Sequence, residues 1–233
     1  MNKYESKFEE RVKDHYLEER GETYHLKKRK LNPDLVPWVA KLRAEKFQPY
    51  IKPTDSVFEY GAGAGWNLIN LKCNSKAAYD LSSLNRKLFA DNGIEFFDEE
   101  IKIPKEQYDV TICHHVLEHV PFPGNTLNTL RNTLKPDGML ILVVPLEEQR
   151  STKYIHHDRE GHLYAWTAQT LGNLVDRSGF QIKDIQVRWT GYDRFAAELS
   201  RKLKMGEAGF RLLRKAAQTV RTDREIILLA TKS

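Results

Sequence analysis

The 233 residues suffice for one α/β domain with appendages, and a charged fraction of 30% beside a hydrophobic fraction of 40% is typical of a water-soluble globular chain. The charged N-terminus lacks the apolar run of a signal peptide, no stretch reaches the roughly 20 apolar residues of a membrane span, and two cysteines cannot build a disulfide framework or a zinc cluster, so we expect a cytoplasmic protein. The net charge of +5 is concentrated between Arg194 and Arg224, where nine Lys or Arg face three acids.

Residues 1–54 are predicted to form a helical cap ahead of the main domain, residues 55–233. Trp38, Val39, Leu42 and Phe47 give an apolar stripe near helical spacing. Two interpretations stay open for this stripe: a helix packed on the core, or a lid over a substrate.

The stretch DSVFEYGAGAGWNL, residues 55–68, places a short apolar run directly before three glycines. Val57 and Phe58 suit a buried parallel strand, and the glycines supply a turn without side chains that lets a ligand lie against the backbone. A helix is expected to follow over Asn67–Leu71. The glycines of this turn are Gly61, Gly63 and Gly65.

The spacing of this turn helps to identify its ligand. A dinucleotide fingerprint, G-x-G-x-x-G, requires a small residue where Trp66 stands, and Glu59, two residues before the first glycine, suits a positively charged ligand. Here the chain resembles the class I S-adenosylmethionine-dependent methyltransferases, whose first motif is an acidic residue, one spacer and G-x-G-x-G. The resemblance implies that Glu59 and the three glycines bind S-adenosylmethionine. The alternative is a tight turn without a ligand.

Two further predicted strands also end in a carboxylate. The second, Lys76–Asp80, places Asp80 where it can accept hydrogen bonds from both hydroxyls of a ribose, with Leu81 beside it, although Asp80 can instead cap the next helix. The third, Ile94–Phe97, is followed by Asp98, and the resemblance implies that this acid contacts the adenine amino group. The alternative for Asp98 is a solvated acidic loop.

The fourth predicted strand, Tyr108–Cys113, runs into HHVLEHVPFP. Residues 117–121, LEHVP, resemble the segment of methyltransferases that act on small molecules. The Asn/Asp-Pro-Pro-Tyr tetrapeptide of the enzymes that methylate a base or an amide nitrogen is missing. His114 and His115 are predicted to face the methyl group as candidate bases, and His114 is also a candidate cofactor contact.

Glu118 and His119 allow a second interpretation. In the ubiquinone-biosynthesis O-methyltransferases, which this segment resembles, acidic residues and a histidine here are associated with a divalent metal. This chain has His115 where an acid is expected. We therefore predict no metal, and we expect Glu118 and His119 to hold the loop by hydrogen bonds.

The rest of the chain completes the alternation of strands and helices. A fifth strand is predicted over residues 139–144, a sixth over 181–187 and, by resemblance antiparallel, a seventh over 225–231. The loop between the fifth predicted strand and Trp166 is rich in aromatic and imidazole groups. We interpret it as a substrate loop with His162 as the third candidate base. The alternative is an Ω-loop packed on its own aromatics. Thr167 is predicted to cap a helix that extends to Arg177.

The basic insertion, residues 190–224, carries apolar residues at helical spacing and is predicted to be an amphipathic helix with a cationic outer side. Three interpretations are open: a cap packed on the core, a surface for anionic lipid, and a nucleic-acid contact. Nucleic acid is the weakest of these because the chain has no recognisable RNA-binding module. The apolar residues are Phe210, Leu213, Ala217 and Val220.

These observations predict a doubly wound, mostly parallel, seven-stranded Rossmann-like α/β sheet. By resemblance we expect methyl transfer from S-adenosylmethionine to a small-molecule acceptor, at a hydroxyl oxygen. Alternatives are a lipid-linked or RNA acceptor, a cofactor-binding scaffold without activity, and a nicotinamide dehydrogenase, which Trp66 disfavours. Monomer and homodimer both remain open.

Overall fold

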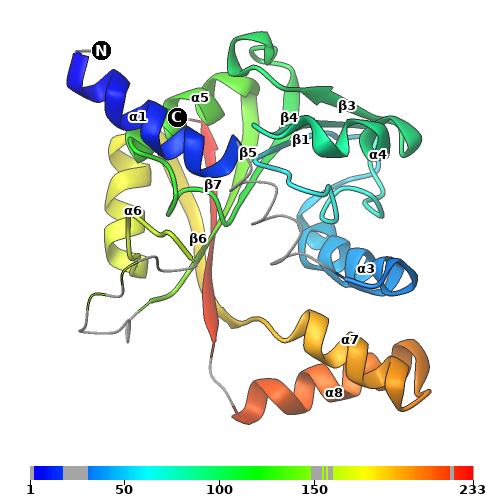
Figure 1. Ribbon diagram of the computed structural model, residues 1–233. Coiled ribbons are helices and arrows are strands. Elements are labelled where there is room, and N and C mark those ends of the chain that lie inside the picture. Colours follow the sequence, from blue (N-terminus) through cyan, green and yellow to red (C-terminus); the bar gives the residue numbers. More distant parts are fainter. Residues whose placement is uncertain are drawn as a thin grey trace.

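The computed structural model describes residues 3–17, 31–147, 154, 156, 160–220 and 223–232. Seven strands form one sheet in the order β3-β2-β1-β4-β5-β7-β6 (Figure 1). The strands are β1 (Ser56–Tyr60), β2 (Ser75–Tyr79), β3 (Ile94–Phe97), β4 (Tyr108–His114), β5 (Leu134–Pro145), β6 (Phe180–Trp189) and β7 (Arg224–Lys232). Because β7 runs antiparallel to β5 and β6 while the other pairs are parallel, the predicted sheet and the predicted direction of its last strand are confirmed.

Helices cover both faces of the sheet. They are α1 (Lys3–Leu17), α3 (Val36–Phe47), α4 (Arg86–Asp91), α5 (Pro123–Thr133), α6 (Ala168–Arg177), α7 (Asp193–Lys202) and α8 (Gly206–Val220). The central strand β4 is apolar on both sides, as a buried parallel strand should be. Its residue Ile112 packs in the core with Phe47 of α3, and its neighbour Cys113 packs in the core with Leu127 of α5.

The segment after the glycine turn corrects one prediction. Residues 67–71 form a series of turns instead of a helix, with Leu68 N–H donating to the carbonyl of Gly65. The side chain of Asn67 is directed back to Glu59, and Asn74 N–H already bonds the carbonyl of Asp55. The chain therefore turns straight into β2.

The basic insertion contains two helices where one was predicted. The α7–α8 hairpin (residues 193–220) packs against α3 around Val39, Ala196, Ala197 and Phe210, which agrees with the interpretation as a cap packed on the core. Helix α7 is hard to recognise in the sequence because alanines form its buried side. The division of the chain at residue 54 stays a prediction.

Among the described residues, none of the helices is both long enough and apolar enough to cross a bilayer.

Candidate functional site

Two cavities meet at the carboxyl edge of the parallel strands, where α/β sheets of this type bind ligands. The larger one has a volume of about 650 Å³ and the smaller one about 200 Å³. Gly61, His115 and His119 line both of them, so the cavities are adjoining parts of one crevice. Asp80 lies only in the smaller cavity, and Glu59 only in the larger.

The glycine turn is required by packing as well as by any ligand. Gly61 and Gly65 have positive φ angles of 75° and 68°, in the left-handed region that favours glycine. A Cβ atom on Gly61 would clash with Val116, and one on Gly65 would clash with Phe89. Hence the turn after β1 can pack against the segment after β4 and against α4 only because these positions lack side chains.

The predicted cofactor acids take different positions. Glu59 is buried in β1, where its carboxylate accepts a hydrogen bond from the Asn67 side chain. At the tip of β2, Asp80 accepts hydrogen bonds from the backbone N–H groups of Gly63 (2.6 Å) and Ser82 (2.9 Å). Each Asp80 oxygen retains capacity for another donor, and Leu81 lies beside it in the smaller cavity.

Asp98 is not among the described residues that line the two cavities. Its carboxylate pairs with the Arg86 guanidinium at 2.5 Å and lies 3.7 Å from the Lys102 ammonium. Two residues further along, Glu100 does line the smaller cavity, and it accepts a hydrogen bond of 2.8 Å from the Tyr60 hydroxyl. The adenine contact of Asp98 stays a prediction, and sequence reasoning missed Glu100.

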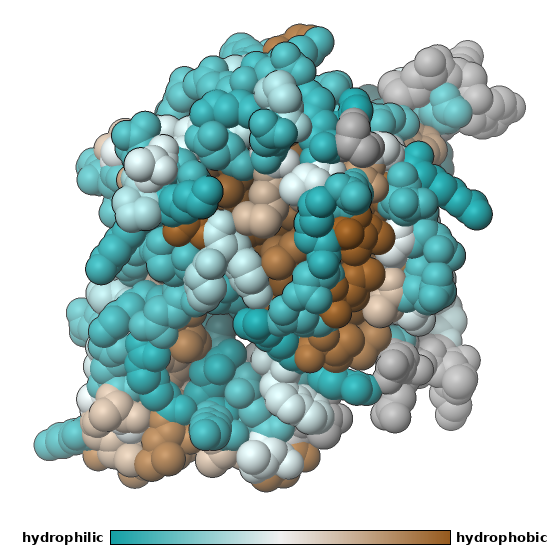
Figure 2. Space-filling model, turned by 180° about the vertical axis from the view of Figure 1, so that it is seen from behind, coloured by the Kyte–Doolittle hydropathy of each residue, from teal (hydrophilic) through white to brown (hydrophobic). Residues whose placement is uncertain are grey.

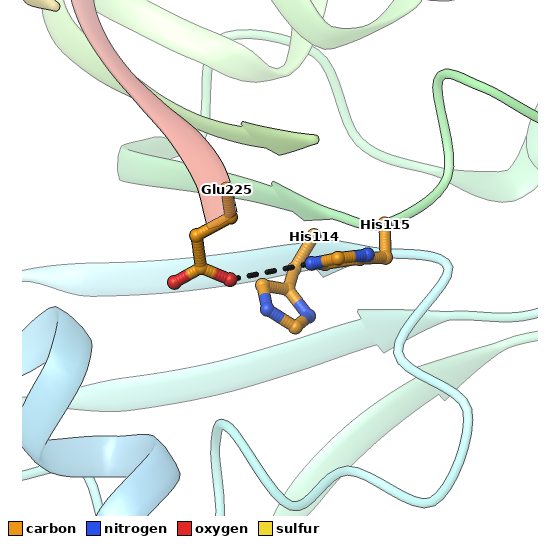
Figure 3. Close-up of side chains that lie close together, drawn as sticks. All are labelled: His114, His115 and Glu225. Atoms are coloured by element: carbon orange, nitrogen blue, oxygen red, sulfur yellow. Dashed lines mark hydrogen bonds and ion pairs between the residues drawn. The ribbon is translucent and has the colours of Figure 1, made fainter. Parts of the chain in front are cut away.

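His114 at the end of β4 and His115 directly after it belong to a partly buried polar cluster (Figure 3). His114 Nε2 lies 3.2 Å from the Lys46 ammonium of α3, and His115 Nε2 lies 3.3 Å from the Glu225 carboxylate at the start of β7. Lys46 and Glu225 form an ion pair of 2.6 Å. His115 adopts a left-handed φ of 54°, so the backbone turns sharply there and the two rings lie side by side, with centroids 4.5 Å apart.

Opposite charges set the protonation of this cluster. Burial would lower the pKa of His115, but the neighbouring carboxylates of Glu118 and Glu225 outweigh burial and hold the pKa above its ordinary value. Burial lowers the pKa of Lys46, and Glu225 partly opposes this effect. Burial would raise the pKa of Glu225, yet His115 and Lys46 bring it well below its usual range. His115 therefore holds its proton more firmly than an ordinary histidine does.

A second cluster lies beside the first one. His162 Nδ1 bonds the Glu147 carboxylate at 2.8 Å, and the His162 ring packs edge-on against His119, with centroids 4.7 Å apart. Burial lowers the pKa of His119 to about 4, although Glu118 opposes the shift. Glu118 is fully buried, and neither of its carboxylate oxygens has a hydrogen-bond partner among the described residues. The nearest imidazole nitrogen is His115 Nδ1, at 3.5 Å.

Both clusters contain donor sets that can hold a divalent cation. The ligand atoms of His114, His115 and Glu225 lie within 4.8 Å of one another, and so do those of Glu118, His119 and His162. In the first set the Lys46 ammonium already neutralises Glu225. The expectation that no metal is used stays a prediction. Glu118 holds the loop through its main-chain carbonyl, which accepts hydrogen bonds from the backbone N–H groups of Leu163 and Tyr164, and not through its side chain.

Sequence reasoning missed Lys46, Glu225 and Glu147. Lys46 and Glu225 are 179 residues apart, so no local motif joins them. One signal was present: Glu225 is a charged residue that opens an otherwise apolar run, IILLA. Part of the predicted substrate loop, including His157 and Asp158, lies outside the described residues.

The chain is similar in sequence to known methyltransferases. A model of the methyltransferase domain family matches residues 28–185. The probable methyltransferase ltbC of Aspergillus luteorubrus is 25% identical over 146 residues, which are 52% of this chain and 50% of the fungal protein. The ubiquinone biosynthesis O-methyltransferase of Glaesserella parasuis is 35% identical over 48 residues, which are 21% of this chain and 20% of that enzyme. The matches thus span half or less of these two relatives.

A solved structure resembles nearly the whole chain. It is the 1,6-didemethyltoxoflavin-N1-methyltransferase of Burkholderia thailandensis, bound to 1,6-didemethyltoxoflavin and S-adenosylhomocysteine. The TM-score is 0.63, the identity is 17%, and the match covers 98% of this chain and 90% of that one. At this identity, the similarity establishes the sheet order and the fold.

Proposed function

We propose, from the premise that this chain belongs to the methyltransferase domain family, that it transfers a methyl group from S-adenosylmethionine to a hydroxyl oxygen of a small molecule. S-adenosylmethionine is the methyl donor of this family. The observation that carries the hydroxyl assignment is the pair His162 and Glu147 in the wall of the larger cavity.

The smaller cavity suits the adenosine part of the donor. Asp80 offers acceptor capacity to ribose hydroxyls, and the mostly apolar wall beside it, with Leu81 and Val120, suits an adenine ring. Glu59, in the adjoining larger cavity, supplies negative charge for the methionine end. When bound, the donor supplies an electrophilic methyl group on its sulfonium, so the chain's main task is to align the acceptor and to exclude water.

A hydroxyl acceptor must lose its proton, and His162 is the best placed base. Its Nδ1 bonds the Glu147 carboxylate, which fixes the tautomer so that Nε2, 4.0 Å from the Glu160 carboxylate, carries no proton and can accept one. Glu147 then stabilises the imidazolium that forms. The adjoining His119 stays neutral at physiological pH because its pKa is about 4, so it does not repel this charge.

His114 and His115 have a different task in this proposal. His115 lies between two carboxylates, which hold its proton, and His114 faces the Lys46 ammonium. The second carboxylate near His162, that of Glu160, is 4.0 Å away and 51% exposed, so it leaves Nε2 more accessible than either nitrogen of His115. His114 and His115 line the larger cavity, where they orient the acceptor.

The test compares two histidines of one loop. His162→Ala should lower methyl transfer by about 10²–10⁴-fold, the usual contribution of a general base, while calorimetry finds unchanged affinity for S-adenosylmethionine. The matched control is His156→Ala, since His156 is exposed and is not among the described residues that line the two cavities. Asp80→Ala, in contrast, should weaken the affinity for S-adenosylmethionine while the protein stays folded.

The assay combines methyl-labelled cofactor with a panel of hydroxyl and amine acceptors. The methylated atom is then identified from the carbon chemical shift of the transferred group. A methyl group found on nitrogen, or wild-type turnover in His162→Ala, would refute the hydroxyl proposal.

A further inference from the structure

The inner face of the α7–α8 hairpin is sufficient to hold it in place. Ala196 and Phe210 are fully buried, and the Phe210 ring stacks on Trp38 of α3, with centroids 6.2 Å apart. Arg211 clamps both carboxylate oxygens of Glu45 at 2.8 Å. The outer face of the hairpin is therefore not needed for packing, and its side chains require another explanation.

That outer face exposes large apolar side chains. Phe195, the half-buried Leu199 and the C-cap residue Leu203 recur every four residues, so they lie on one side of α7 and its end. Phe195 is 61% exposed, Leu203 56%, Met205 41% and Leu212 63%. The hairpin lies at the lower right in Figure 1 and therefore at the lower left in Figure 2, which shows the molecule from behind. Brown, hydrophobic atoms gather at that corner of Figure 2. Several apolar side chains in one projecting element mark an interaction surface.

The charges of the hairpin complement an anionic partner. Each of its acids is already used in an ion pair. These pairs are Asp193 with Arg214 (2.6 Å), Glu198 with Arg201 (2.9 Å) and Glu207 with Lys41 (3.0 Å). Lys202, Lys204 and Lys215, in contrast, have no acidic partner in the part of the chain that the structure describes. Lys202 and Lys204 flank Leu203, so positive charge surrounds the apolar tip.

We propose that the outer face of the α7–α8 hairpin docks on an anionic lipid bilayer. Leu203 and Met205, at the turn between the helices, would enter the boundary between headgroups and acyl chains. Lys202 and Lys204 extend their ammonium groups to the lipid phosphates while their alkyl stems follow the apolar tip. A helical hairpin with an apolar outer side and a lysine rim has the chemistry of an interfacial anchor.

Two other occupants fit less well. In a symmetric dimer the same patch faces its own copy, which would bring Lys202 and Lys204 close to identical charges. Single-stranded nucleic acid is held by aromatic stacking along a basic groove, whereas the tip offers aliphatic Leu203 and Met205 on a convex turn. A bilayer satisfies both the aliphatic tip and the lysines.

The position of the hairpin connects docking to the reaction. Phe195 belongs to the outer face and also lines the larger cavity, together with Tyr192 and Arg194. Docking would place this side of the cavity at the bilayer. The expected methyl acceptor is then a hydroxyl-bearing amphiphile carried in the membrane. This last step depends on the proposed function, whereas docking itself does not.

The experiment is sedimentation of the full chain with phosphatidylcholine vesicles, with and without phosphatidylglycerol. The protein should sediment with the anionic vesicles, and added salt should release it. Lys202→Gln with Lys204→Gln should reduce partitioning by about 25-fold, since each lysine near an anionic surface contributes roughly fivefold. Leu203→Ser with Met205→Ser should also reduce it.

Ile101→Ser with Lys105→Glu is the matched control, because Ile101 is 89% exposed and Lys105 is exposed elsewhere on the surface. Equal binding to both kinds of vesicle, or equal losses in the control and the hairpin variants, would overturn the proposal. The proposal would also be overturned if the protein formed a dimer that Leu203→Ser with Met205→Ser dissociates. RNA binding that is lost in the double lysine variant would overturn it too. Circular dichroism verifies that each variant is folded, and no outcome depends on methyl transfer.

Discussion

Lys46 and Glu225 show how this fold accommodates charge next to its core. The Glu225 side chain is only 2% exposed and the Lys46 side chain 17% exposed. Removing an isolated carboxylate from water is costly, but the Lys46 ammonium at 2.6 Å and the His115 imidazole at 3.3 Å both compensate it. One pair therefore ties α3 to β7 and sets the environment of both histidines.

Replacing the buried lysine tests this role. Lys46→Met removes the ion pair at 2.6 Å from the buried Glu225, so the free energy of unfolding should fall by about 3–5 kcal/mol in urea denaturation. Lys41→Met is the matched control on the same helix, because Lys41 is 54% exposed and its pair with Glu207 should contribute at most about 1 kcal/mol. Similar losses in the two variants would contradict the assignment.

His119 should make stability depend on pH in a defined window. Burial lowers its pKa from 6.5 to about 4, so below about pH 6.5 the unfolded chain takes up a proton that the folded protein refuses. This contribution is complete above that pH and is lost as the pH falls toward the folded value. Between about pH 7.5 and about pH 5 it should cost about 2 kcal/mol.

Urea denaturation of His119→Asn at these two pH values checks the expectation. The variant should lose less stability on acidification than the wild type, by about 2 kcal/mol. His156→Asn, which changes an exposed imidazole, should follow the wild type. An unchanged pH dependence in His119→Asn would show that the imidazole is not held neutral in the folded state.

At the scale of the element, the α7–α8 hairpin depends on one aromatic ring. Phe210 is fully buried and stacks on Trp38, so Phe210→Ala should destabilise the hairpin by about 3–5 kcal/mol. Hydrogen exchange should then be faster in α7 and α8 than in the sheet. Leu212→Ala is the control two residues away, because Leu212 is 63% exposed and should change stability by less than about 0.5 kcal/mol. Equal exchange in both variants would argue against the packing described.

The strands were readily predicted from the sequence, because buried parallel strands are short continuous apolar runs between turn residues. The third strand, Ile94–Phe97, has the predicted bounds, and Thr167 caps α6 as predicted. The turns at residues 67–71 were missed, since Asn67 bonds Glu59 and Asn74 bonds Asp55. Such partners follow from the folded arrangement and not from local periodicity.

The candidate site was also predictable from the sequence only in part. Glu59, Asp80 and His114 were recognisable because each lies at the end of a predicted strand, and the carboxyl ends of parallel strands meet at one edge. Glu225 was missed because its partners Lys46 and His115 come from distant segments, and Glu147 was missed because no local pattern directs it to His162, 15 residues away. The sequence therefore indicated which edge carries the site, while the hydrogen bonds that select a base required the structure.

At the scale of the whole molecule, the crevice is assembled from segments that are far apart in the chain. Helix α1 lies across the smaller cavity, where Glu9 and Val12 contribute to the wall. The Phe8 ring meets Phe122 edge-on, with centroids 6.1 Å apart. The described side chains of α1, residues 5–12, are exposed or half-buried, so this helix covers the cavity without filling the core.

Deleting residues 1–17 should show whether α1 covers the cavity or belongs to the folded core. Because little of α1 is buried, the melting temperature without ligand should change only slightly. In the proposed function, however, α1 covers the adenosine part of the donor, and losing that apolar cover should weaken S-adenosylhomocysteine binding by about tenfold in calorimetry. Phe8→Ala, which removes only the contact with Phe122, should give a smaller loss of the same sign. Unchanged affinity in the deletion would show that the ligand lies elsewhere in the crevice, whereas a collapsed melting temperature would show that α1 belongs to the folded core.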